Sequence, residues 1–306
     1  MDANAAEVYK YFSAKGWTLN AIAGICGNMQ SESWLNPGVW QSLKEGNYSG
    51  GFGLVQWTPA TNYTNWANAN GYGITDPNGQ LYWIDALSGS SGQWIATSAY
   101  NLSWSAFKKS SQAPEWLASA FLKNFERAGV EVEATRRSQA RYYYNLLSKY
   151  DTNSKAVESA VQWAINIAND NSHGYDQTHR DGPDYDCSSL VCWAYYQAGL
   201  NTRPGYTPAT GTMYNVLRVA GFEDVTSSVN LTTGEGIQRG DVLLNTVHHT
   251  AMSIGNGQVV NASQNEHGGA TGGATGDQTG KEIYVRNYYN YPWNYVLRLP
   301  GGGGAV

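Results

Sequence analysis

The residue pattern changes abruptly about halfway along this chain of 306 residues. Up to residue 168 most segments have the apolar spacing of helices. From residue 241 onward, short runs rich in β-branched and aromatic residues alternate with turns. A domain built only of helices or only of strands cannot account for both patterns. A chain of 306 residues is also longer than a typical domain with a single hydrophobic core. We therefore expect an α+β protein with two domains.

The polar stretch Y-D-T-N-S-K at 150–155 is the expected linker between these domains. It separates a mostly α domain, 1–149, from an α+β domain with an antiparallel sheet, 156–300. The ending G-G-G-G-A-V at 301–306 is typical of a flexible tail. Residues 267–280 are nearly all small or polar, so we expect a mobile loop there.

Local signals set the expected elements of the first domain. Gly16 closes a first helix, and Thr18 is a suitable N-cap for the second. The glycine-dense G-G-F-G-L-V-Q-W indicates a small β-hairpin, and Gly129 would end the helix that begins at Pro114. The helices expected before the sheet, including one that opens the second domain, cover 4–15, 18–31, 59–69, 77–87, 114–127, 132–149 and 156–168.

Composition excludes two classes of partner. The net charge is −5 and no basic run is present, so we do not expect nucleic acid as a partner. No stretch of about 18 apolar residues is present, so we expect no membrane span. The N-terminus lacks the pattern of a signal peptide, which suggests export by lysis or in a virus particle, or a piece of a longer protein. The 12 Trp and 22 Tyr suit a cleft that binds sugars.

Three cysteines do not form a disulfide framework. Cys26 lies in an apolar helical stretch and is expected in the core. Cys187 and Cys192 are five residues apart, about 140° around a helix, so they cannot form a metal-binding pair on one face. We expect neither a metal nor a cofactor.

Cys187 has the sequence context of a nucleophile. In D-C-S-S-L-V, Asp186 is a plausible N-cap and Cys187 falls in the first helical turn. The unpaired amides and positive dipole end of a helix N-terminus lower the pKa of a thiol. We therefore expect an activated, exposed thiol at this position.

The segment V-H-H-T-A-M-S-I-G-N-G-Q-V-V-N-A-S can supply a base and its orienting partner. A three-residue hairpin loop with Gly257 in the left-handed conformation would pair Ala251 with Asn261. His249 would then share a sheet face with Asn261 as its diagonal neighbour, whereas a two-residue loop would separate them. His248 would lie on the opposite face.

These segments, followed by G-D-Q-T-G-K-E-I-Y-V and Y-P-W-N-Y-V-L-R, resemble the NlpC-type cell-wall cysteine hydrolases, particularly their phage branch. The resemblance implies a papain-like core in which Cys187, His249 and Asn261 form a catalytic triad that cuts an amide of the peptidoglycan stem peptide. Many of those enzymes have histidine where this chain has Asn261. Tyr175 matches a tyrosine that faces the nucleophile, and Ser188 is a second candidate substrate contact. Amidase and endopeptidase specificity both remain open.

In the first domain, M-Q-S-E-S-W-L-N-P-G places Glu32 at the end of an otherwise apolar helix. A carboxyl group against apolar walls stays protonated and can act as a general acid. The G-G-F-G-L-V-Q-W segment would form the opposite lip of a cleft. The candidate sugar-binding side chains are Trp34, Trp40, Tyr48, Gln56 and Trp57.

The pairing of E-S-W-L-N-P with G-G-F-G-L-V-Q-W, together with N-F-E-R-A-G at 124–129, resembles the lysozyme-like domain of phage tail proteins. The resemblance implies cleavage of the β-1,4 bond between N-acetylmuramic acid and N-acetylglucosamine, with Glu32 as the acid. Glu45 is the first candidate for a second carboxylate, while Glu126 and Asp76 remain open. Without a second carboxylate in the cleft, a lytic transglycosylase route is favoured.

The sequence thus favours a bifunctional peptidoglycan hydrolase, a released phage lysin or a tail-associated lysin acting outside the cell. Peptidoglycan is the expected substrate, and other phage tail proteins are candidate partners. Two alternatives stay open. One is a non-catalytic wall-binding or tail-scaffold protein that retains hydrolase folds. The other is a zinc amidase using His248, His249 and Cys187, although their spacing suits zinc poorly.

Overall fold

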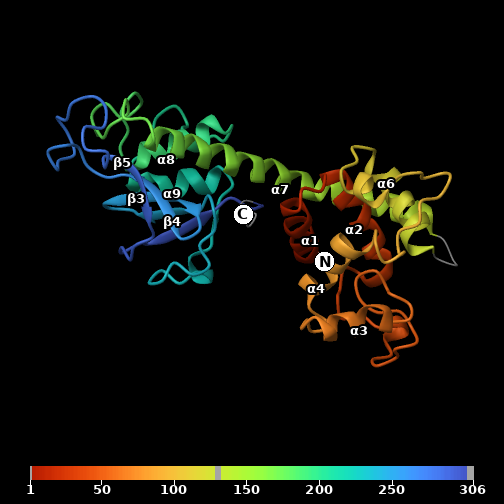
Figure 1. The fold of residues 1–306 in the computed structure, drawn as a ribbon. Helices are drawn as coiled ribbons and strands as arrows, with labels where there is room; N and C mark the ends of the chain where they lie inside the picture. Colours follow the sequence, from red (N-terminus) through yellow and green to blue (C-terminus); the bar gives the residue numbers. More distant parts are fainter. Residues whose placement is uncertain (1, 128–131, 302–306) are drawn as a thin grey trace. The chain divides into compact units, whose positions relative to one another are not determined.

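The computed structural model describes residues 2–127 and 132–301, and the chain forms two compact units, Met1–Lys149 and Tyr150–Val306 (Figure 1). The first unit is built from helices and short helical turns, as the sequence predicts, and the second adds an antiparallel sheet. Among the described residues, no helix has both the length and the apolar character needed to cross a bilayer.

Short helices surround one central helix in the first unit. Thr18 caps that helix as predicted, because its side chain accepts a hydrogen bond from the Ala21 amide. The elements are α1 (Asp2–Ala14), α2 (Leu19–Ser33), η1 (Gln41–Leu43), α3 (Thr61–Ala69), α4 (Pro77–Tyr82), η2 (Trp83–Leu87), α5 (Trp104–Lys108), α6 (Pro114–Phe121), η3 (Leu122–Glu126) and the first half of α7 (Glu133–Ala168). Gly129, the expected end of the 114–127 helix, lies outside the described residues.

Two glycines let α2 approach its neighbours closely. A Cβ atom at Gly24 would lie 2.9 Å from the Leu117 Cβ of α6. One at Gly27 would lie 2.6 Å from the Arg136 carbonyl oxygen of α7. Real Cβ atoms do not come so close to a neighbour, so both positions require glycine. This close packing brings the end of α2 alongside the start of α7.

The G-G-F-G-L-V-Q-W segment is not the β-hairpin expected from its glycines. Phe52 makes only isolated bridges, to Trp40 and Trp57, and the chain between them turns with positive φ at Gly53 and Gln56. The fully buried Gln80 holds this turn, because its side-chain oxygen accepts from the Leu54 amide at 2.8 Å. Tight turns leave too few extended residues for a strand ladder.

The expected linker at 150–155 is helical. Helix α7 runs without a break from Glu133 to Ala168, so it joins the two helices predicted at 132–149 and 156–168. The stretch contains neither proline nor glycine, and a polar segment can continue a helix by pairing along its surface. Lys155 and Asp151 form such a pair one turn apart, with Nζ and Oδ2 2.8 Å from each other.

The second unit contains a six-stranded sheet in the order β1-β6-β2-β3-β4-β5, with every pair antiparallel. The short runs predicted as strands after residue 241 do form strands. Besides the second half of α7, its elements are α8 (Cys187–Gln197), α9 (Thr210–Val219), β1 (Glu223–Asp224), η4 (Thr226–Ser228), β2 (Val242–Asn245), β3 (His249–Gly255), β4 (Gln258–Ala262), β5 (Ile283–Asn287) and β6 (Tyr295–Arg298).

The two faces of the sheet are buried by different partners. One face packs against α7, α8 and α9, and its core includes Met252 and Val260 (Figure 1). The other face, with Ala251 and Val259, is covered by loops rich in aromatic side chains. Because side chains alternate along a strand, each residue of β3 can be assigned to one face from its neighbours.

The loop expected at 267–280 is irregular, but its turns are hydrogen-bonded. The Asn265 side chain accepts from the Gly269 amide, and the Asp277 carboxylate accepts from the Gly280 and Glu282 amides. Of the expected tail, Gly301 is described and residues 302–306 lie outside the described part of the chain.

Candidate active sites

A cleft of about 490 Å³ opens in the first unit beside the end of α2. Two carboxyl groups, from Glu32 and Glu126, are among its walls. Trp34, directly after α2 in the left-handed conformation, adds an indole that is 61% exposed. The other lining residues are Val39, Trp40, Gln41, Ser42, Leu43, Gly51, Gln56 and Thr58.

Glu32 does not have the purely apolar surroundings expected from the sequence. The Arg136 guanidinium of α7 lies 2.5 Å from its Oε1 and is itself almost fully buried. A second contact fixes this arginine, because Nη1 donates to the Asn28 side chain at 3.1 Å. The positive charge therefore compensates the Glu32 carboxylate. Sequence reasoning missed it because Arg136 comes from a helix 104 residues later.

Glu126, rather than Glu32, has the buried environment that the sequence predicts for the general acid. Burial raises the pKa of Glu126 well above its usual value, and the nearby charge of Glu32 raises it further. Its Oε1 atom is buried without a hydrogen-bond partner among the described residues. Glu126 is therefore the carboxyl group of this cleft whose surroundings favour the protonated form. The sequence signal was N-F-E-R-A-G, which was noted without giving Glu126 this role.

The other candidate carboxylates and aromatic residues divide between cleft and scaffold. Glu45 is exposed in a turn and is not among the cleft-lining residues, and Asp76 caps α4 through the Asn78 amide. Trp57 is buried against Tyr63, with ring centroids 4.5 Å apart, so it supports the fold rather than the cleft. Tyr48 is half-exposed and packs edge-on against Trp40, a cleft residue, with ring centroids 5.2 Å apart.

Gln56 does line the cleft, but its side-chain amide is engaged. Nε2 donates to the Val39 and Gly53 carbonyls at 3.0 and 3.1 Å. The residue itself has a positive φ of 47°, which few residues other than glycine adopt. Gln56 therefore shapes the lip of the cleft and leaves its side-chain oxygen to face a ligand.

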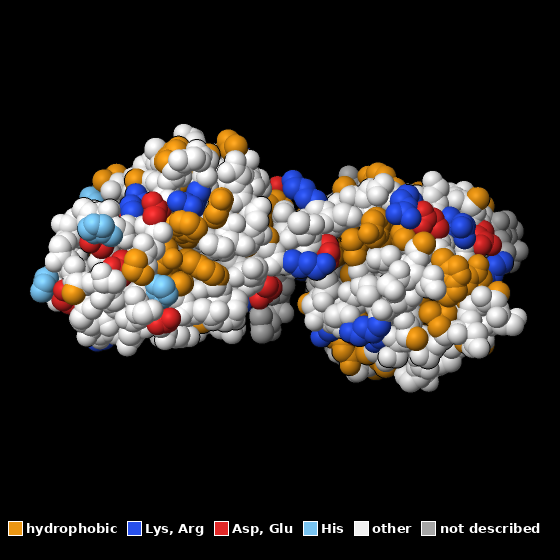
Figure 2. Space-filling view, turned by 90° about the horizontal axis from the view of Figure 1, so that it is seen from above, with side chains coloured by type: hydrophobic (Ala, Val, Ile, Leu, Met, Phe, Trp, Pro, Cys, Tyr) orange, Lys and Arg blue, Asp and Glu red, His pale blue; other side chains and the backbone are white. Residues whose placement is uncertain are grey.

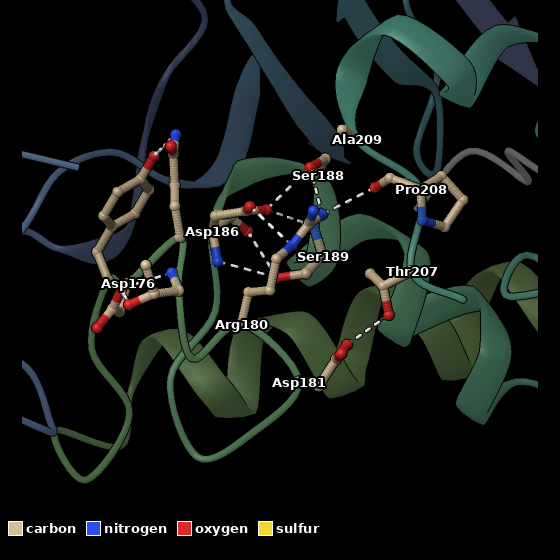
Figure 3. A network of polar contacts seen from close by, with 12 residues as sticks. Asp176, Arg180, Asp181, Asp186, Ser188, Ser189, Thr207, Pro208 and Ala209 are labelled. Atoms are coloured by element: carbon tan, nitrogen blue, oxygen red, sulfur yellow. Dashed lines mark hydrogen bonds and ion pairs between the residues drawn. The ribbon is translucent and has the colours of Figure 1, made fainter. Parts of the chain in front are cut away.

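In the second unit, Asp186 begins α8 as predicted. Its side chain accepts from the Ser189 amide at 2.7 Å, and the Ser189 hydroxyl accepts from the Asp186 amide at 2.9 Å, which completes a capping box. Figure 3 shows Arg180 lying across this cap, with its Nε 2.8 Å from Asp186 Oδ2 and a hydrogen bond to the Pro208 carbonyl. The start of α8 is thereby fixed to two loops.

The Cys187 thiol at this helix start is buried rather than exposed, with 5% of its surface accessible. Burial raises the pKa of the thiol to about 12, and the charge of Asp186 adds to the effect. Hydrogen bonds from the Thr250 and Ser188 amides act in the opposite direction but are weaker. The expectation of a lowered thiol pKa is therefore wrong, because desolvation outweighs the helix terminus.

The β3–β4 hairpin has the predicted register through a different turn. Met252 pairs with Val260, so the ladder extended by one residue sets Ala251 opposite Asn261. The turn itself has two residues, Asn256 and Gly257, both with positive φ. A β-bulge between Ser253 and Gly255 supplies the extra residue that a three-residue loop would have contributed. His249 and Asn261 therefore lie on the same face of the sheet.

All five histidines belong to the second unit, and Figure 2 shows histidine side chains at its surface. His248 is exposed in the turn before β3, whereas the His249 ring packs against Tyr291 and Trp293, with ring centroids 5.7 and 6.0 Å away. Burial lowers the pKa of His249 to about 4, assisted by the charge of Arg286. His249 is therefore neutral at physiological pH and can accept a proton.

The three proposed catalytic residues are neighbours without a closed hydrogen-bond chain. The amide that contacts the Cys187 sulfur belongs to Thr250, the residue next to His249. Asn261 is 1% exposed, and both polar atoms of its side chain lack a partner. Within the part of the chain that the structure describes, no hydrogen bond joins the imidazole to the thiol or to Asn261.

The two remaining predicted contacts of this site, Tyr175 and Ser188, are both buried but have different neighbours. Burial raises the pKa of Tyr175 to about 12, and the charge of Cys187, which lies close by, adds to the effect. The Ser188 hydroxyl instead donates to Asp186 and accepts from Arg180, so it belongs to the helix cap (Figure 3). Ser188 therefore has no free donor for a substrate.

Comparison with known proteins assigns each unit. Residues 3–147 match the family described as phage tail lysozyme, and residues 181–260 and 259–302 match the endolysin-like domain. The chain joins a phage tail lysozyme domain to an endolysin-like domain. Glu32 and Glu126 thus fall inside the lysozyme match. Cys187 and His249 fall inside the match to the endolysin-like domain.

One curated relative and two solved structures are similar to parts of the chain. Morphogenesis protein 1 of Bacillus phage B103 is 44% identical over 148 residues, which cover 48% of this chain and 40% of that protein. NlpC1 from Trichomonas vaginalis is 20% identical, with a TM-score of 0.31 over 48% of this chain and 45% of its own. The P60 domain of an M. avium subspecies paratuberculosis antigen is 18% identical, with a TM-score of 0.29, and the match covers 47% of this chain and 97% of that chain.

Proposed function

We propose that this protein is a phage peptidoglycan hydrolase with two active sites, one for the glycan and one for the stem peptide. The observation that carries the proposal is the presence of two separate reactive clusters in one chain. One is a cleft with two carboxyl groups in the phage tail lysozyme domain. The other is a cysteine at a helix start beside a neutral histidine in the endolysin-like domain. The first cluster suits cleavage of the glycan and the second suits cleavage of the stem peptide, and both belong to peptidoglycan.

In the endolysin-like domain, Cys187 and His249 would act as nucleophile and general base. Both are neutral before reaction, because burial raises the pKa of the thiol and lowers that of the imidazole. His249 takes the thiol proton as the sulfur attacks the amide carbonyl, and Asn261 orients the ring. The Cys187 amide, in the first turn of α8, supports the oxyanion. Collapse of this intermediate breaks the C–N bond while His249 returns its proton to the leaving amine, and water then hydrolyses the thioester and restores the thiol.

In the phage tail lysozyme domain, Glu126 and Glu32 would divide the work between them. Glu126 holds the proton in the free protein and can give it to the glycosidic oxygen. Glu32, paired with Arg136, keeps a negative charge in the cleft that stabilises the oxocarbenium-like transition state or activates water. Because a second carboxyl group lines the cleft, hydrolysis is favoured over the transglycosylase route.

The phage setting follows from the matched families and the relative. Both family descriptions and the relative's name refer to phage lysis or assembly, so we propose that the protein acts outside the cell, on a virion tail or as a released lysin. Other tail proteins would be its partners in the first case. The chain spans 40% of the matched relative, so this placement extends beyond the aligned region.

Digestion of purified cell walls tests the proposal. The wild type should lower the turbidity of a wall suspension, and mass spectrometry of the products should detect new reducing ends together with new amino termini or free stem peptides. Cys187→Ala should remove only the peptide products, and Glu32→Ala only the glycan products. Equal clearing by the wild type and the double variant would refute catalysis and leave the wall-binding alternative. Inhibition by chelators but not by thiol alkylation would favour the zinc alternative.

A further inference from the structure

Arg286, in the middle of β5, has no acidic partner in the structure. Its side chain is half-buried, and its guanidinium carbon lies 4.0 Å from the ring centroid of Tyr289. Nη1 donates to the Tyr284 hydroxyl at 3.1 Å. Four other arginines of the second unit do have carboxylate partners: Arg180 with Asp186, Arg203 with Asp181, Arg239 with Glu158, and Arg298 with Asp241. Among the described residues, no carboxylate lies within ion-pair distance of Arg286.

The position of Arg286 borders the proposed peptide-cutting site. In the β4–β5 ladder Tyr284 pairs with Asn261, and Arg286 pairs with Val259 on the same face as His249. The Arg286 charge is close enough to help lower the pKa of His249. Tyr289, which stacks on the guanidinium, also lies near Cys187. Burial raises the pKa of Tyr289 to about 12, and the charge of Cys187 adds to this effect while the charge of Arg286 opposes it.

The Arg286 guanidinium has the chemistry to bind a carboxylate ligand. Arginine offers five donors in a planar fork, and stacking on an aromatic ring leaves the edge donors available. The Tyr284 hydroxyl takes one of the Nη1 protons, so other donors remain to bind a planar anion. An unpaired, half-buried arginine costs solvation energy, which a bound carboxylate would recover.

We propose that Arg286, held by Tyr284 and Tyr289, binds a free carboxylate of the stem peptide and so positions the amide in front of Cys187. This assignment deepens the proposed function and rests on it. Two carboxylates share this chemistry: the free α-carboxylate of the D-glutamyl residue and the C-terminal carboxylate. Binding of either would give the enzyme a preference for stem peptides in which that group is not amidated.

Binding and cleavage of three synthetic ligands test the proposal. They are N-acetylmuramoyl-L-Ala-γ-D-Glu-L-Lys-D-Ala, a copy amidated at the D-Glu α-carboxylate, and a copy amidated at the C-terminus. Calorimetry in the Cys187→Ala background measures affinity without turnover. We expect amidation of the recognised carboxylate, or Arg286→Gln, to weaken binding by about 10- to 100-fold, the range for hydrogen bonds to charged groups. The Arg286→Gln variant should bind the ligand amidated at the recognised carboxylate only slightly more weakly than either change alone would produce.

Controls separate this role from a structural one. Arg218→Gln changes an exposed arginine of α9, which donates to the Phe222 carbonyl, and should leave all affinities unchanged. Arg286→Lys should keep part of the discrimination. Equal affinity for all three ligands, or an equal loss on all three in Arg286→Gln, would overturn the proposal. If the wild type binds with the expected preference but cuts no ligand, the proposed catalysis fails while the carboxylate site stands.

Discussion

Glu32 and Glu126 line the same cleft, but Arg136 lies 2.5 Å from Glu32, while one oxygen of Glu126 is buried without a partner in the described part of the chain. Burial and the neighbouring charge of Glu32 raise the pKa of Glu126, so the two carboxyl groups have different electrostatic environments. Such a difference is how glycosidases assign acid and base roles to two similar side chains. Each role can be tested separately because the two groups come from different elements.

Glu126→Gln should lower glycan cleavage by about 100-fold or more, the usual contribution of a general acid. Folding should be little affected, because a neutral amide of nearly the same shape replaces a carboxyl group whose charged form is disfavoured by burial. The measurement is the release of reducing sugars from cell walls, with the thermal midpoint recorded alongside. Glu45→Gln is the matched control, since Glu45 is exposed outside the cleft. Full activity in Glu126→Gln together with loss in Glu45→Gln would restore the assignment made from the sequence.

The Cys187 thiol should react slowly with alkylating agents at neutral pH. Burial raises its pKa to about 12, so only a small fraction is thiolate, and the alkylation rate should rise about tenfold per pH unit between pH 7 and 10. Mass spectrometry of iodoacetamide-treated protein gives the rate at each cysteine. Cys26 and Cys192 are also buried and serve as internal references. Rapid, pH-independent labelling of Cys187 alone would instead indicate a preformed thiolate.

Peptide cleavage should depend on pH through His249. The pKa of its ring is about 4, so the neutral base is present above that pH, and activity should fall as the pH drops through 4. The folded pKa lies below the unfolded value near 6.5, so the unfolded state binds more protons between these pH values. Above pH 6.5, His249 therefore does not lower the free energy of unfolding. As the pH falls from 6.5 to 4, His249 should lower the free energy of unfolding by at most about 3 kcal/mol.

NMR titration of the His249 ring provides the direct measurement. Arg286→Gln removes one cause of the lowered pKa, so the midpoint should move upward. His248 is exposed and offers a reference resonance in the same spectrum. A His249 midpoint near 6.5 in the wild type would show that the ring is solvated, contrary to its packing against Trp293.

Part of the geometry around Cys187 and His249 could be predicted because each feature depends on residues close together in sequence. The Asp186 cap needs only three following residues, and the shared face of His249 and Asn261 needs only a hairpin register. The prediction of a three-residue turn was wrong, yet the β-bulge beside Gly255 preserves the predicted register. The thiol environment could not be predicted, because desolvation of Cys187 depends on segments that are distant in sequence. For the same reason, the pairing of Glu32 with Arg136 was not visible.

Asn261 should be needed for activity more than for stability. Both polar atoms of its side chain are buried without partners among the described residues, so Asn261→Ala removes two unpaired groups while it creates a small cavity. These effects oppose each other, and we expect the free energy of unfolding to change by less than about 1 kcal/mol. Peptide cleavage should fall if Asn261 orients His249 during catalysis, whereas Asn261→His should retain part of it. A large loss of stability without loss of activity would exclude the orienting role.

Arg298 should be essential for folding of the endolysin-like domain. Its Nε and Nη2 atoms lie 2.8 and 2.6 Å from the two carboxylate oxygens of Asp241, which is fully buried at the start of β2. Arg298→Met leaves that carboxyl group without its partner, and breaking such a pair costs about 3–5 kcal/mol. Arg239→Met is the matched control, because its partner Glu158 is half-exposed, and it should cost about 1 kcal/mol or less. Urea unfolding followed by circular dichroism measures both changes. Equal stability of the two variants would show that Asp241 is tolerated unpaired, which its raised pKa allows only if it becomes protonated.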